Sequence, residues 1–124
     1  MPFIAAATAP AFELHGARFT GLASPQRGAT ENAVWLVELD HRGDAVPHAL
    51  TREETFVCIE GRALAQVGDE THELTAGSAL VVPANVRFAI RNPDKTPFKA
   101  VAVLPVGGQA CIEGQPAFTP PWAR

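Results

Sequence analysis

One histidine and one glutamate, His48 and Glu54, lie six residues apart where a polar turn leads into an apolar run. An imidazole and a carboxyl group in one apolar pocket can act as general base and general acid. Such a pair suits proton transfer at a carbon next to a carbonyl, or a dehydration. Burial raises the pKa of a carboxyl group, whereas an ion pair with the imidazole lowers it. We interpret the two residues as a candidate acid–base pair; alternatively, they only hydrogen-bond each other or the backbone.

Apolar side chains surround these two residues on the expected inner face of the strands. Successive side chains of a strand point to opposite faces, so alternate positions line one wall. The expected pocket residues are Leu50, Phe56, Cys58, Phe88, Arg52 and Trp35. Arg52 would lie at the mouth and could receive a carboxylate or phosphate oxygen, unless it is a solvated surface residue. Trp35 is either a core residue or a stacking platform.

The elements that must position these residues are short and extended. Runs rich in Val, Ile and Phe, separated by Gly, Pro, Asn and Asp, predict strands and turns. The predicted strands are 33–39, 55–60, 62–67, 70–74, 78–83, 86–92 and 98–106. No window shows convincing helical periodicity. The pattern therefore predicts an all-β fold, an antiparallel sandwich or barrel.

Both ends of the chain are less regular. Residues 12–32 are expected to hold one or two edge strands and a loop around Ser24–Gly28. The segment 113–124 contains several prolines, which cannot donate to a strand ladder. We expect it to run as an extended strap, anchored by Phe118 and Trp122, that covers an open end of the barrel or reaches a second subunit.

Two segments have a spacing that resembles the paired motifs of the cupin family. In 43–61, Gly43 is followed by His48, Glu54 and Gly61 at nearly the family intervals. In 77–92, Gly77, Pro83 and Asn92 follow the second motif. The resemblance implies a small single-domain cupin of the type-2 kind over residues 1–124. Its fold would be an antiparallel jelly-roll β-barrel, also called a double-stranded β-helix.

The family motifs normally supply three histidines and a glutamate to a transition metal, with open positions for substrate. His48 and Glu54 match one of these histidines and the glutamate. Leu50 and Phe88 stand where the other two imidazoles belong, and neither can donate a lone pair. The resemblance therefore implies a degenerate metal site, and no cofactor is expected. A divalent transition metal held by His48 and Glu54 is the alternative.

Composition restricts the partners. The chain has 124 residues, 47% of them apolar, enough for one domain with a real core. A formal net charge of −3 gives no basic surface for nucleic acid. No run reaches the roughly 20 apolar residues of a membrane span, and the apolar N-terminus has no basic region typical of a secretory signal. Cys58 and Cys111 are interpreted as thiols of a cytoplasmic protein.

Three interpretations of the function follow. The first is a cupin of unassigned activity with a small-molecule pocket that lacks the full metal-ligand set. The alternative is a cupin enzyme, either a metal-free isomerase or lyase using His48 and Glu54, or a metal-dependent dioxygenase-like protein. A purely structural or partner-binding role is the third. Apolar outer strands and extended termini also predict a homodimer.

Overall fold

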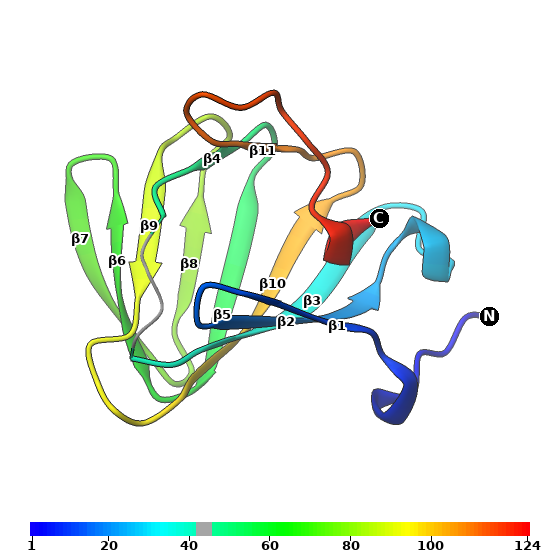
Figure 1. Ribbon diagram of the computed structural model, residues 1–124, viewed down its shortest axis with the longest axis horizontal. Coiled ribbons are helices and arrows are strands. Elements are labelled where there is room, and N and C mark those ends of the chain that lie inside the picture. Colours follow the sequence, from blue (N-terminus) through cyan, green and yellow to red (C-terminus); the bar gives the residue numbers. More distant parts are fainter. Residues whose placement is uncertain (42–45) are drawn as a thin grey trace.

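The computed structural model describes residues 1–41 and 46–124 and consists almost entirely of short strands (Figure 1). The described residues form eleven strands and three single-turn 3₁₀ helices. The strands are β1 (Ala11–Leu14), β2 (Ala17–Ala23), β3 (Asn32–Leu39), β4 (Ala49–Leu50), β5 (Glu54–Glu60), β6 (Arg62–Val67), β7 (Glu70–Thr75), β8 (Ala79–Val82), β9 (Phe88–Arg91), β10 (Phe98–Pro105) and β11 (Ala110–Cys111). The helices are η1 (Ala6–Thr8), η2 (Pro25–Arg27) and η3 (Pro121–Ala123). None of these helices is long and apolar enough to span a membrane.

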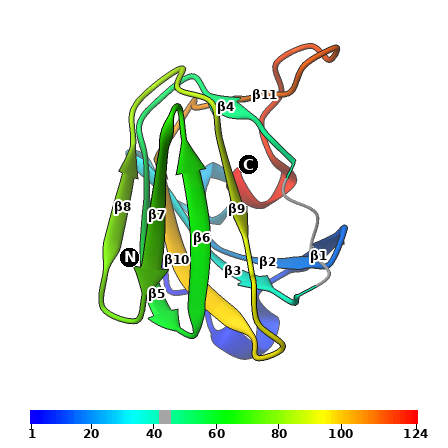
Figure 2. The same cartoon turned by 90° about the vertical axis from the view of Figure 1, so that its left-hand side faces the viewer.

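The strands make two facing sheets and a short ribbon across one end. The larger sheet has the strand order β1-β2-β3-β10-β5-β8, and the smaller has the order β7-β6-β9. Every pairing is antiparallel. In Figure 2, β6 and β9 stand in front of β10 and β3. The ribbon of β4 and β11 crosses the top of Figure 1. The predicted all-β antiparallel jelly roll is confirmed.

Side-chain alternation explains why these strands form a barrel with a closed core. On β10, the four inward residues are buried and alternate with half-buried ones that face outward. Strands β3 and β5 repeat this pattern. The buried core consists of Ala33, Trp35, Val37, Leu50, Phe56, Cys58, Ala63, Leu74, Val82, Phe88, Phe98, Ala100, Ala102, Leu104, Ala110 and Ala123. Many of these are alanines, which let the two sheets approach closely.

A buried asparagine holds the loop between β9 and β10. Asn92 donates from Nδ2 to the carbonyl oxygens of Leu39, at 2.9 Å, and of Thr96, at 2.7 Å. Its Oδ1 accepts from the backbone N–H of Asp94 at 2.9 Å. This is the asparagine that closes the second motif, and its role here is to satisfy backbone groups at the lower end of the barrel.

The strand boundaries agree with the predicted ones to within about two residues, with two additions. Strands β4 and β11 have two residues each and were not predicted. The segment 12–32 holds an edge strand, β1, as expected. Its second strand, β2, is paired on both sides, with β1 and β3. The motif glycine Gly43 lies outside the described residues.

The C-terminal segment closes the upper end of the barrel. Beyond β11, Phe118 and Ala110 exchange backbone hydrogen bonds of 3.1 and 2.7 Å. The chain then runs down to η3, which contacts β1, β2 and β3 (Figure 1, red). Phe118 and Trp122 pack against the core. Phe118 and Trp122 therefore anchor the segment to its own barrel, as expected; its contact with a second subunit stays a prediction.

Candidate functional site

His48 lies just before β4, and its imidazole is half-buried against an aromatic ring. Its backbone exchanges hydrogen bonds of 3.0 and 2.8 Å with Phe88 on β9. The ring centroids of His48 and Phe88 are 4.4 Å apart. Burial lowers the pKa of His48, and the hydrogen bond to the carbonyl of Val46 only partly opposes that shift. The imidazole is therefore neutral at pH 7.

The hydrogen bond to Val46 also assigns the tautomer of His48. Nδ1 lies 2.9 Å from the carbonyl oxygen of Val46. A carbonyl oxygen can only accept, so Nδ1 carries the proton. Nε2 of the neutral ring then holds the lone pair, which makes it the basic nitrogen of the site.

Glu54 begins β5 and is only 3% exposed. Alternation along β5 puts its side chain on the inner face with those of Phe56 and Cys58. Its carboxyl group makes no hydrogen bond or ion pair with any residue that the structure describes. Burial raises its pKa from 4.5 to about 8. At neutral pH the group is a protonated acid without a partner among those residues.

Leu50 and Phe88 fill the interior beside these two residues. Leu50 is 3% exposed and Phe88 2%. The Phe88 ring contacts both the His48 ring and the Phe56 ring, the latter at 5.8 Å between centroids. The two positions that the family uses for further imidazoles therefore carry hydrocarbon side chains that belong to the core.

These residues do not fit the four-ligand metal centre of the family. Two of the four positions have no lone pair to donate. Within residues 1–41 and 46–124, no group of three or more His, Cys, Asp or Glu side chains is placed to hold a metal ion.

The remaining predicted site residues divide between core and surface. Trp35, Phe56 and Cys58 are buried in the core. Burial raises the pKa of the Cys58 thiol, and its Sγ lies 3.6 Å from the carbonyl oxygens of Glu60 and Gly61. Arg52 is exposed in the turn before β5 and makes no hydrogen bond or ion pair within the described part of the chain. The structure thus packs the predicted apolar pocket residues into the core and leaves Arg52 in solvent; that they line a ligand pocket stays a prediction.

The C-terminal segment brings in residues that sequence reasoning did not connect with the site. The indole of Trp122 stacks on the ring of Phe19, with centroids 3.8 Å apart and planes 5° from parallel. Arg27 donates to the carbonyl oxygen of Trp122 at 3.2 Å. The sequence offered Trp122 as an anchor, but the alternation signal in residues 12–32 was too weak to identify Phe19 as its partner.

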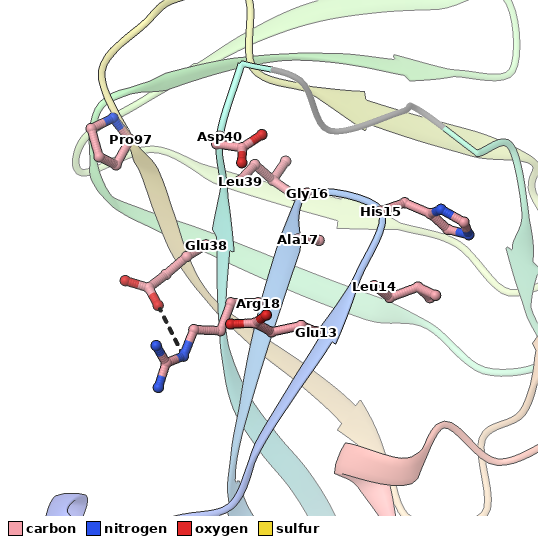
Figure 3. A pocket seen from close by; sticks show the side chains of 10 residues that line it. All are labelled: Glu13, Leu14, His15, Gly16, Ala17, Arg18, Glu38, Leu39, Asp40 and Pro97. Carbon is pink, nitrogen blue, oxygen red and sulfur yellow. Dashed lines mark ion pairs between the residues drawn. The ribbon is translucent and has the colours of Figure 1, made fainter.

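A separate hollow of about 430 Å³ lies on the outside of the molecule (Figure 3). It is lined by Glu13, Leu14, His15, Gly16, Ala17, Arg18, Glu38, Leu39, Asp40 and Pro97. Val34 and Thr55 pair with the same residue of β10, so Thr55 lies level with Val34. Glu54 precedes Thr55 and so lies level with Ala33. Leu39 is six residues further along β3, which places the hollow about 20 Å along the strands from Glu54. It is not part of the site around Glu54.

Comparison with known proteins supports the fold. A family model described as a cupin domain matches residues 35–104. The polyketide cyclase RemF from Streptomyces resistomycificus is similar in structure, with a TM-score of 0.80 and 16% identity over 94% of this chain and 87% of that one. A sugar phosphate isomerase of the cupin superfamily from Silicibacter pomeroyi gives 0.73 and 15% over 92% and 83%.

A third similar structure belongs to a much longer protein. Salicylate 1,2-dioxygenase from Pseudoaminobacter salicylatoxidans gives a TM-score of 0.71 at 20% identity, over 86% of this chain and 31% of that one. No curated protein sequence matches the chain. At such identities, the likeness to all three solved structures shows a shared fold and leaves the activity open.

Proposed function

The chain belongs to the cupin family, and on that premise we propose that its barrel interior binds a small organic molecule through the protonated carboxyl group of Glu54. The observation that carries this proposal is the isolation of that group. It is 3% exposed and makes no hydrogen bond with the described residues. Burial keeps this carboxyl group neutral, and a neutral carboxyl group can donate to a ligand oxygen. Among the described residues, the fully buried side-chain polar atom that lacks a partner is Ser24 Oγ rather than an oxygen of Glu54.

The surroundings of Glu54 define the class of ligand. A neutral carboxyl group donates a hydrogen bond to a carbonyl, hydroxyl or ether oxygen. Leu50, Phe56 and Phe88 offer hydrocarbon surface to the rest of the molecule. The ligand is therefore a mostly apolar molecule with one or two oxygen functions.

The test is a thermal-shift screen of phenols, aryl ketones and lactones at pH 6.5, followed by measurement of Kd for the hits. Affinity is expected to fall as the pH rises through about 8, because the carboxyl group ionises and ceases to donate. Glu54→Gln keeps an amide donor and should bind without this pH dependence, whereas Glu54→Leu should bind at least tenfold more weakly. The exposed neighbour Glu53→Gln is the matched control. Hits with equal affinity for all four proteins would refute the proposal.

A second candidate function, acid–base catalysis, is favoured by the protonation states of the two polar residues. His48 is neutral with its lone pair on Nε2, and Glu54 is protonated. Nε2 would take a proton from the carbon next to a carbonyl while the Glu54 carboxyl group protonates the carbonyl oxygen, which gives an enol. The names of two similar structures, an isomerase and a cyclase, agree with such chemistry only by analogy. His48→Gln would abolish turnover but retain binding.

A metal-dependent, dioxygenase-like function has less support. The dioxygenase resembles this chain in fold. His48 and Glu54 are the only residues at the motif positions that can donate to a metal, and Leu50 and Phe88 are packed into the core.

We also propose a cytoplasmic homodimer. Two free thiols, those of Cys58 and Cys111, suit a reducing compartment. The outer face of the six-stranded sheet carries the exposed apolar residues Val57, Ile59 and Val81. A second copy seated on this face would cover them.

A further inference from the structure

An aromatic slot lies on the inner face of β2 and β3, filled by a side chain from the end of the chain. The Trp122 indole stacks on Phe19 at 3.8 Å. The rings of Trp35 and Phe12 flank it at 6.5 and 6.3 Å, tilted by 56° and 57°. One parallel ring and two tilted rings form a favourable environment for any planar aromatic group. The rings around Trp122 therefore make a slot that recognises flat aromatic shape.

This slot adjoins the site around Glu54. Trp35 and Phe56 pair with the same residue of β10, Ala102, whose small side chain is fully buried between them. The strands of Trp35 and Phe56 are thus about 10 Å apart, and Glu54 lies about 7 Å from Phe56 along β5. These two offsets put Trp35 and Glu54 about 12 Å apart, so a molecule with a ring in the slot must be longer than about 12 Å to bring an oxygen atom to Glu54.

We propose that the slot is a binding subsite for a planar aromatic ring, and that Trp122 occupies it until a ligand displaces the C-terminal segment 112–124. The proposal rests on the proposed binding at Glu54 and names the class of its ligand: a fused or linked aromatic molecule with a hydroxyl or carbonyl group. Trp122 acts as an internal competitor for the slot.

The C-terminal segment is the part of the wall that can leave without breaking a sheet. After β11, three contacts join its backbone to the rest of the described chain: the hydrogen bonds between Phe118 and Ala110, a 3.4 Å bond from Gln26 to Arg124, and the bond from the Arg27 side chain to the carbonyl oxygen of Trp122. Residues 113–117 are exposed. Phe118, Trp122 and Ala123 pack against the core, but only these few hydrogen bonds hold the backbone. The segment can therefore open at a lower free energy than the hydrogen-bonded β-sheets.

Arg27 forms a latch that holds Trp122 in place. Its Nε donates to the carbonyl oxygen of Leu22 at 2.8 Å, and its Nη2 donates to that of Trp122 at 3.2 Å. Gly21 makes room for this contact, since a side-chain carbon at that position would meet the Arg27 guanidinium. The latch sets the fraction of molecules in which the slot is open, and the apparent affinity for a ligand scales with that fraction.

The proposal is tested by titrating 2-naphthol, a two-ring phenol, into the full chain at pH 6.5 with calorimetric detection. Arg27→Met removes the latch, so the open state becomes more populated and 2-naphthol should bind about tenfold more tightly than to the wild type. Gly21→Ala displaces the guanidinium and should act in the same direction. Arg91→Met removes the same charge from an exposed position on β9 and should leave the affinity unchanged.

Trp122→Ala vacates the slot and should bind 2-naphthol most tightly; if this variant does not fold, Arg27→Met and Gly21→Ala still decide between the outcomes. Equal or weaker binding by the latch variants than by Arg91→Met overturns the proposal, as does the absence of 2-naphthol binding to any variant.

Glu54→Leu separates the two proposals. If it binds as well as the wild type while the latch variants bind more tightly, the slot is confirmed and the role of Glu54 is wrong. If Glu54→Leu loses binding and the latch variants have no effect, the role of Glu54 stands and the slot is wrong.

Discussion

Glu54 is an acidic residue at an inward-facing strand position, where an apolar residue is more usual. Phe56 and Cys58 share its face of β5 and are equally buried. The fold therefore favours the protonated form of this carboxyl group over the ionised one. In the unfolded chain, where water solvates the carboxylate, the same group is acidic at its usual pKa.

This difference makes the stability of the fold depend on pH. Between the ordinary pKa of 4.5 and the folded value of about 8, the folded state holds a proton that the unfolded state has lost. The free energy of unfolding should therefore fall as the pH rises from 4.5 to 8, by up to roughly 5 kcal/mol from this group, and level off above that. Glu54→Gln should lack this loss. Urea unfolding at pH 5 and pH 9 measures it, with Glu53→Gln as the exposed control.

If the wild type and Glu54→Gln lose the same stability between these two pH values, the carboxyl group is not buried in its neutral form. Titration elsewhere in the protein is common to both variants and cancels in the comparison. The prediction concerns only the difference between them.

The sequence predicted which residues are buried better than it predicted which residues they contact. Spacing alone placed Leu50 and Phe88 among the pocket residues, and both are buried in the core. The pairing of His48 with Glu54 stays a prediction: in the described residues His48 bonds to the carbonyl of Val46, and no bond joins it to Glu54. A local backbone acceptor depends on the path of the chain before β4, which residue patterns do not encode.

At the scale of the elements, the turn between β5 and β6 is the tightest. Gly61 lies there at a φ of +74°, and a side-chain carbon at this position would meet the carbonyl oxygen of Pro97. Gly68, in the next turn, has a φ of +57° but open space around it. Both conformations favour glycine, yet only one of them is also crowded by backbone.

Substituting alanine at these two glycines should separate the two effects. Gly68→Ala should cost about 1 kcal/mol for the left-handed conformation alone. Gly61→Ala should cost about 2 to 4 kcal/mol, because the start of β10 must also shift. Urea unfolding of both variants measures the difference. Equal losses would show that Pro97 yields to the new methyl group at no cost.

Longer strands were predictable from sequence because alternation repeats along them, as in β3, β5 and β10. The two-residue strands β4 and β11 were not, because two residues contain no period. They exist because two distant segments of the chain meet there: Ala110 pairs with Leu50, and Gln109 N donates to Oγ1 of Thr51 at 2.9 Å. Such elements are products of tertiary structure rather than of local preference.

At the scale of the whole molecule, the outer face of the six-stranded sheet is apolar over several strands. Val57 is level with Val101, and Val101 with Leu36, so apolar side chains continue across three strands. Val81 extends the row on the edge strand β8, where it is 52% exposed. We expect a second copy to cover this face.

Sedimentation velocity or light scattering should therefore give twice the mass of the 13.1 kDa chain. Val81→Lys would place a charge in the apolar row and should shift the protein toward monomer by at least tenfold in Kd. Leu14→Lys, at an equally exposed position on β1, is the matched control and should leave the dimer intact. A monomeric wild type would rule out this use of the face.

Ala102, the small residue between Trp35 and Phe56, has one further consequence for protein engineering. Ala102 is fully buried, so each methylene added at this position must push one of the two rings aside, while no polar atom is touched. On the proposed binding in the barrel, a set of substitutions at codon 102 would therefore change the length of the compounds that bind.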